Sequence, residues 1–142
     1  MLELKDLRQD IMSMDLVIQP ALVGVMAALK GILYDEYLPE SPHLWVDVGV
    51  HMAAQLVASG ITLEFLVPAV GDAARMADPL IHGGISGLVK ENFLDTEAIS
   101  SLALIETRGR IPQPHYYTFQ TGFFEGVAYG SVASGATYAA GV

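Results

Sequence analysis

A stripe of apolar side chains, spaced alternately by three and four residues, runs through residues 2 to 34. It consists of Leu4, Leu7, Ile11, Met14, Ile18, Ala21, Val25, Ala28 and Ile32. This spacing predicts a single helical face. Charged residues lie beside the stripe in its first half, whereas residues 16 to 29 carry no charge. Pro20 lies within the pattern and predicts either a kink or the start of a second helix.

A second helix is predicted after Ser41, where a hydroxyl cap precedes a proline, with its end at Gly60. It is apolar nearly all round, and its polar residues recur every four positions at Asp47, His51, Gln55 and Ser59. A helix of this kind is buried in a protein core or in lipid. We therefore expect Asp47, His51 and Gln55 to form a buried polar stripe that faces a polar partner or trapped water.

The middle of the chain gives weaker signals for helix or strand. Residues 61 to 67 alternate like a strand, although a helix that bends at Pro68 is favoured. Asp78 precedes a proline, which predicts that its side chain caps a further helix. Residues 99 to 106 fit either a helix or a strand, and both alternatives stay open.

Small residues recur every four positions in the last segment, residues 119 to 142. They are Gly122, Gly126, Gly130 and Ser134. On a helix they form one ridge, against which another helix can pack closely. An extended arm is the alternative. The segment carries one charge, Glu125, which we expect either at the headgroup level of a membrane or facing a partner's cation.

Residues 111 to 118 contain two prolines, which exclude a regular helix and predict an extended arm. Aromatic residues lie in this arm and directly after it, at Tyr116, Tyr117, Phe119 and Phe123. They are predicted to dock the arm onto a neighbouring subunit or to form an aromatic belt at a membrane surface.

These patterns predict a mostly α single domain over residues 1 to 142, a small bundle of about five helices. Its apolar helices are kinked by proline, and an extended Pro/Tyr arm precedes the Gly-ridged C-terminal helix. The predicted segments are 1–34, 35–110, 111–118 and 119–142.

The composition changes where such a bundle is expected to lie. Hydrophobic residues make up 52% and charged residues 16%, where soluble domains average about 25% charged. Lipid or partner subunits are therefore expected to cover much of the surface. A net charge of −9 argues against nucleic-acid binding. The mixed-charge N-terminus does not resemble a secretory signal.

Two Asp-xxx-His pairs, Asp47 with His51 and Asp78 with His82, are the best candidates for chemistry. With Glu125 they could form a carboxylate-histidine metal site. A cap role for Asp78 and a mutually hydrogen-bonded Asp47 and His51 are favoured instead. The sequence contains no cysteine, no nucleophile elbow and no phosphate loop, so we predict no enzyme activity and no cofactor.

The favoured function is therefore a non-enzymatic structural subunit of a large assembly, namely a capsid or membrane-associated protein of a virion. Its partners would be copies of itself or other subunits, with or without lipid, and its location a virion or a membrane. The alternatives are an accessory subunit of a membrane complex and a soluble helical homo-oligomer. A metalloenzyme built on Asp47, His51 and His82 is the weakest alternative.

Overall fold

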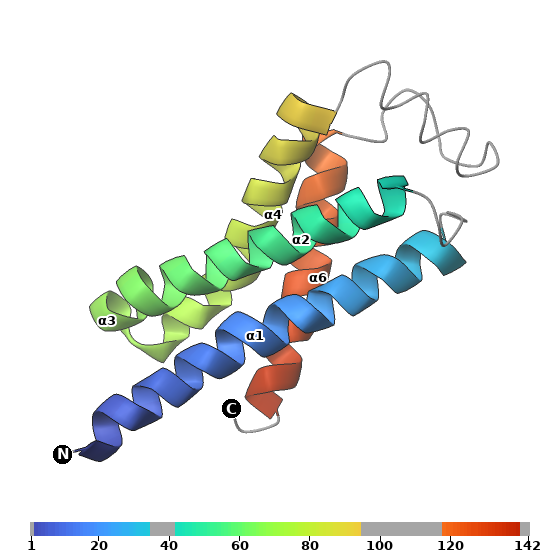
Figure 1. The fold of residues 1–142 in the computed structure, drawn as a ribbon. Helices are drawn as coiled ribbons and strands as arrows, with labels where there is room; N and C mark the ends of the chain where they lie inside the picture. The colour runs from blue at the N-terminus through green and yellow to red at the C-terminus, as the bar shows by residue number, and fades with distance from the viewer. Residues whose placement is uncertain (1, 35–41, 95–117, 140–142) are drawn as a thin grey trace.

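The computed structural model describes residues 2–34, 42–94 and 118–139, which are almost entirely helical and contain no strand (Figure 1). The long helices are α1 (Leu2–Leu33), α2 (Pro42–Ile61), α4 (Asp78–Val89) and α6 (Phe119–Ala139). A π-helical turn (Thr62–Leu66), α3 (Val67–Val70) and a 3₁₀ helix (Asp72–Ala77) connect α2 to α4, and a second π-helical turn (Lys90–Leu94) extends α4. The prediction of a mostly α bundle is confirmed. Residues 111 to 117 of the predicted arm and residues 99 to 106 lie outside the described residues.

One predicted helix boundary is wrong, and one of the two alternatives at Pro20 is excluded. Helix α1 passes through Pro20 without a new helix beginning there, because long helical stretches on both sides carry the chain past the one lost hydrogen bond. The helical path also continues beyond Gly60 to Val70. It ends at Gly71, whose φ of 85° is the left-handed conformation that terminates a helix. Residues 61 to 67 are accordingly helical, as favoured.

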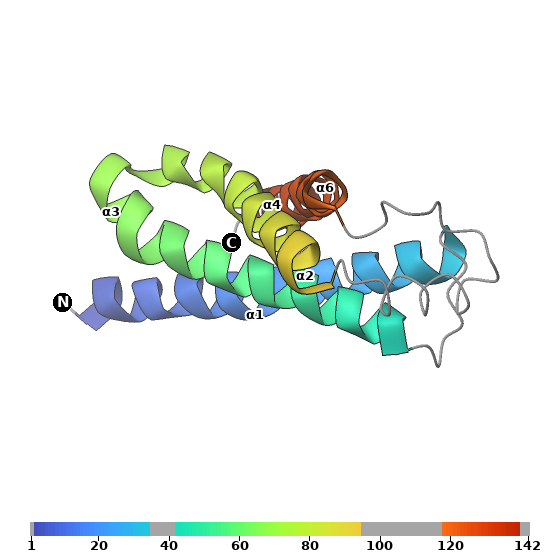
Figure 2. The same ribbon diagram turned by 90° about the horizontal axis from the view of Figure 1, so that it is seen from above.

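The helices pack as two pairs. Helix α1 lies along α2, and α4 lies along α6, which crosses α1 and α2 steeply (Figure 1). Seen from above, α1 and α2 form one layer and α4 and α6 lie over it (Figure 2). Where the layers meet, a small apolar core is formed by Val23, Ala27, Leu44, Val48, Tyr129 and Ala133.

Glycines allow α4 and α6 to touch backbone to backbone. The facing pairs are Gly122 with Gly87, Gly126 with Gly83, and Gly130 with Pro79. A Cβ atom on Gly126 would lie only 2.6 Å from the Cα of Gly83, so no larger residue fits without moving a helix. The glycines on both helices therefore set the distance between them.

Where exposure is described, the outer surface of the four long helices carries no charge. In residues 16–33, 44–61, 78–89 and 119–139, every residue described as exposed is uncharged. Large apolar side chains are exposed on every helix, at Val17, Val25, Leu29, Leu33, Trp45, Val46, Leu56, Val57, Leu80, Leu88, Phe124 and Val132. The charged residues in the same ranges are all turned inward, at Lys30, Asp47, Asp78 and Glu125. These stretches thus have an uncharged exterior around a partly polar interior.

Candidate functional site

Two stripes of buried polar residues face each other inside the bundle. Helix α2 contributes Asp47, His51, Gln55 and Ser59, and α4 with its π-helical extension contributes Asp78, His82, Ser86 and Lys90. Side chains four residues apart share one face of a helix, which is why each set forms a line. The first residue of each stripe contacts the last of the other, Asp47 with Lys90 and Asp78 with Ser59. The two stripes therefore run in opposite directions.

Four charged groups meet at one end of the stripes. The Nζ atom of Lys90, which is fully buried, lies 2.6 Å from Asp47 Oδ1 and 3.0 Å from Glu125 Oε2. The Nζ atom of Lys30 on α1 lies 3.3 Å from Glu125 Oε1. A buried charge without a partner would cost several kcal/mol, on the order of 3 to 5. Pairing two ammonium groups with two carboxylates offsets that cost here.

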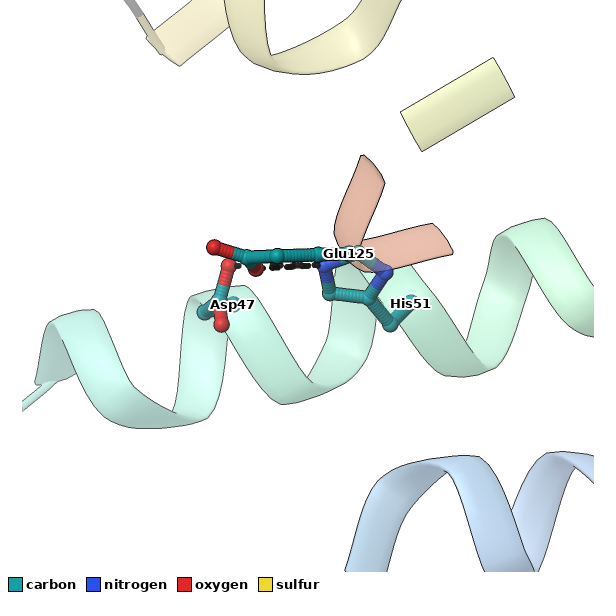
Figure 3. Close-up of side chains that lie close together, drawn as sticks. All are labelled: Asp47, His51 and Glu125. Carbon is teal, nitrogen blue, oxygen red and sulfur yellow. Dashed lines mark hydrogen bonds and ion pairs between the residues drawn. The ribbon is translucent and has the colours of Figure 1, made fainter. Parts of the chain in front are cut away.

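A pair of histidines continues the network toward its centre. His51 Nε2 lies 3.2 Å from Glu125 Oε2 and 3.8 Å from Asp47 Oδ1 (Figure 3). His51 Nδ1 lies 3.0 Å from His82 Nε2, and His82 Nδ1 lies 2.8 Å from Gln55 Oε1. The two imidazole rings therefore form a chain of hydrogen-bonding contacts between Glu125 and Gln55.

The amide of Gln55 joins the histidines to the other end of the network. Its two N–H groups are shared among three acceptors, Gln19 Oε1 at 2.7 Å, Ser59 Oγ at 3.0 Å and Asp78 Oδ2 at 3.3 Å. Gln19 in turn donates to Thr137 Oγ1 at 2.9 Å. Side chains from α1, α2, α4 and α6 are thus joined through the amides of Gln55 and Gln19.

Asp78 does not cap α4, so the predicted cap role is wrong. The capping position is Ala77, and no side chain caps this helix end. The carboxylate of Asp78 is buried and accepts hydrogen bonds from Thr62 Oγ1 at 3.1 Å and from Ser59 Oγ at 3.4 Å. As the first residue of the α4 polar stripe, Asp78 points toward α2 rather than along its own helix.

A cavity of about 530 Å³ opens beside this end of the network. Its polar lining includes Gln19, Ser59, Thr62, Arg75, Asp78 and Ser134. The network therefore extends from the Lys30 side of the bundle to a cavity next to Asp78.

The predicted polar stripe is buried, and the glycines of the predicted ridge lie against α4. Asp47, His51 and Gln55 are buried between α2 and α4. Gly122, Gly126 and Gly130 face α4. Ser134 lies farther along α6, with its Oγ atom 3.5 Å from Asp78 Oδ2.

Of the four aromatic residues predicted to dock onto a partner, the structure describes two. Tyr116 and Tyr117 lie outside the described residues. Phe119 and Phe123 belong to α6, with ring centroids 5.7 Å apart, and both lie against glycines of α4 in the same chain. Glu125 likewise pairs with Lys30 and Lys90 of its own chain rather than with a partner's cation.

Sequence reasoning missed Lys90, the central cation of the network. The signal was present, because Asp78, His82, Ser86 and Lys90 repeat the four-residue spacing of the α2 stripe. Interpreting Asp78 as a cap removed the first member of this series and hid the pattern. Lys30 also stood out, as the single charge between residues 16 and 34.

Asp47, His51 and Glu125 bring ligand atoms within 4.8 Å of one another, and these residue types can bind a divalent cation. The ammonium group of Lys90 already lies between the two carboxylates, so a metal ion would have to displace it. His82 directs its Nε2 atom at His51 rather than at a common centre with Asp47. The donor set therefore fits the chain's own lysine better than a metal.

The chain matches none of the family models, curated proteins or solved structures with which it was compared. Its class is defined by its own fold and site. It is a helical bundle that exposes no charged residue in residues 16–33, 44–61, 78–89 and 119–139 and that contains an interior network of ion pairs and hydrogen bonds.

Proposed function

We propose that this chain is a non-enzymatic, membrane-embedded subunit of a larger assembly. The observation that carries the proposal is that no charged residue is exposed in residues 16–33, 44–61, 78–89 and 119–139 of the long helices, where the charged side chains are turned inward. Soluble monomers rarely expose apolar surface on this scale, since it favours association. In lipid the same surface is well solvated, and helices satisfy their own backbone hydrogen bonds.

The lengths of the helices fit a bilayer. Two stretches are long and apolar enough to cross a membrane, Leu16–Leu33 with 18 residues and Leu44–Val70 with 27 residues. At about 1.5 Å per residue they span about 27 and 40 Å, against a hydrocarbon thickness of about 30 Å.

Small residues on the outer surface support contacts with further helices. A Cβ atom on Gly49, Gly84 or Gly135 would meet nothing within 4 Å. Glycines on lipid-facing surfaces let neighbouring helices approach closely. The virion predicted from the sequence is one assembly of this kind, and it stays a prediction.

Replacing Val25 with arginine tests the membrane location. Val25 lies near the middle of Leu16–Leu33 and is 57% exposed. An arginine at the centre of a membrane helix costs about 2.5 to 3.5 kcal/mol of insertion free energy. We expect the wild-type chain to stay with membranes after an alkaline carbonate wash and the V25R variant to be retained much less.

Leu33→Arg is the matched control, because Leu33 is exposed at the end of the same stretch. An arginine there can extend its guanidinium group to the membrane surface, so retention should stay close to that of the wild type. A soluble oligomer would give another result. The wild-type chain would be released by the wash, and both variants would behave alike, since surface substitutions change stability by only about 0.5 kcal/mol.

A further inference from the structure

The cavity beside Asp78 lies at the end of the bundle where α2 is connected to α4 (Figure 1). Its wall includes Thr62 at the start of that connection and Arg75 and Met76 near its end, together with residues of α1, α2, α4 and α6. The volume of about 530 Å³ falls within the range of small-molecule sites, about 300 to 1,000 Å³. One water molecule takes up only about 30 Å³. The cavity therefore has room for an organic molecule as well as for single ions or waters.

Two side chains of opposite charge line this cavity, Asp78 and Arg75. Asp78 is 4% exposed, whereas Arg75 is half-buried, so Asp78 is the less accessible of the two. Opposite charges attract strongly where little water separates them. A ligand that uses both side chains therefore carries a cation, which meets Asp78, and an anion, which meets Arg75.

Three hydroxyl groups in the cavity wall contact the carboxylate of Asp78. They belong to Thr62 at 3.1 Å, Ser59 at 3.4 Å and Ser134 at 3.5 Å. These separations are longer than the usual O–H···O distance of about 2.5 to 3.0 Å. Hydroxyl oxygens also accept hydrogen bonds, and a primary ammonium group has three N–H donors. The surroundings of Asp78 thus fit a primary ammonium group better than a trimethylated one, which has no N–H.

The position of the cavity along the helices indicates where the anion comes from. Gln19, which lines the cavity, is the fourth residue of Leu16–Leu33 and lies about 4.5 Å along the helix from its first residue. Arg75 lies beyond the end of Leu44–Val70. The headgroup region of a bilayer is about 5 to 8 Å thick on each side. In a membrane the cavity is therefore at the level of the lipid phosphates, whose geometry matches the planar guanidinium group of Arg75.

We propose that this cavity binds the phosphoethanolamine headgroup of a membrane lipid, with the ammonium group at Asp78 and the phosphate at Arg75. The acyl chains extend from the cavity past Met76, which belongs to its wall and is 81% exposed. The inference rests on the proposed membrane location, because that location puts the cavity at headgroup depth. Soluble phosphoethanolamine carries the same two charged groups, so it tests the cavity without a bilayer.

Thermal unfolding of the full chain in detergent micelles tests the choice of headgroup. Lipids with ethanolamine, choline or glycerol headgroups and identical acyl chains are added at equal concentrations. We expect the ethanolamine lipid at saturation to raise the midpoint of unfolding by about 5 °C. The other two lipids should bind about tenfold more weakly, because choline has no N–H donor and the glycerol headgroup has no cation. Equal shifts with all three lipids would overturn the proposal.

Asp78→Asn and Arg75→Gln test the two contacts separately. Asp78→Asn should remove the preference for the ethanolamine lipid over the choline lipid. Arg75→Gln should weaken the binding of both lipids by about tenfold, because both carry a phosphate. Arg75 is half-buried and lies outside the candidate spans, so this variant is expected to fold even if Asp78→Asn does not.

Glu64→Gln is the matched control for these variants. It removes an exposed charge from the same connection between α2 and α4, and Glu64 lies outside the cavity wall. Lipid binding should therefore equal that of the wild type. An unchanged affinity in Arg75→Gln, or an unchanged lipid preference in a folded Asp78→Asn, would contradict the assignment.

Soluble phosphoethanolamine separates this inference from the membrane location. If the wild-type chain is retained by membranes but binds neither the ethanolamine lipid nor the soluble headgroup, the headgroup site is wrong and the membrane location stands. If it binds the soluble headgroup but not the lipid, the ligand is a free molecule and the lipid assignment is wrong. If carbonate releases the chain while both probes bind in micelles, the membrane location fails and the ligand chemistry of the cavity is supported.

Discussion

Replacing Lys90 with methionine is expected to destabilise the bundle by about 3 to 5 kcal/mol. Methionine fills a similar volume but leaves two inward-facing carboxylates, Asp47 and Glu125, without the cation that lies 2.6 and 3.0 Å from them. Lys30 contacts only one of the two, Glu125, in the described ion pairs. The free energy of unfolding, measured in detergent micelles against denaturant, reports the loss.

Two further variants test whether the loss of stability comes from the ion pairs of Lys90 or from any substitution at this end of the helix. Glu91→Gln alters the adjacent exposed residue, and it should change the free energy of unfolding by no more than about 0.5 kcal/mol. Adding Asp47→Asn to the Lys90→Met variant should recover part of the lost stability, because one unpaired carboxylate is removed. If Lys90→Met alone is as stable as the wild type, the buried ion cluster does not stabilise the fold.

Gly126→Leu is expected to cost more than about 3 kcal/mol, the upper end of ordinary overpacking. A Cβ atom at this position would lie 2.6 Å from both Gly83 Cα and Ser86 Oγ. Backbone atoms of α4 cannot rotate away as a flexible side chain can. Helices α4 and α6 would therefore have to separate, and both the midpoint of thermal unfolding and the free energy of unfolding should fall.

Gly135→Ala is the matched control on the same helix. A Cβ atom there would meet nothing within 4 Å, so the free energy of unfolding should stay the same or rise by up to about 1 kcal/mol from improved helix propensity. Similar losses for Gly126→Leu and Gly135→Ala would show that glycine flexibility, rather than close packing of α4 on α6, explains the ridge.

Local patterns in the sequence were sufficient to predict the helices. The three- and four-residue spacing in residues 2 to 34 and the four-residue spacing of glycines in α6 are properties of one helix and its faces. The predicted helix end at Gly60 is wrong because propensity rules treat a residue by itself, whereas neighbouring helical turns decide whether it ends a helix.

The sequence by itself determined which residues share a helical face, including Asp47, His51 and Gln55 on α2, because side-chain direction repeats every 3.6 residues in any α-helix. Only the tertiary structure decided which face meets which. The antiparallel packing of α2 against α4 brings Lys90 to Asp47 and His82 to His51, and the glycine contact with α4 brings Glu125 between them. His82 and Glu125, which both contact His51, lie 31 and 74 positions from it in the sequence. Helical periodicity carries no information over such separations.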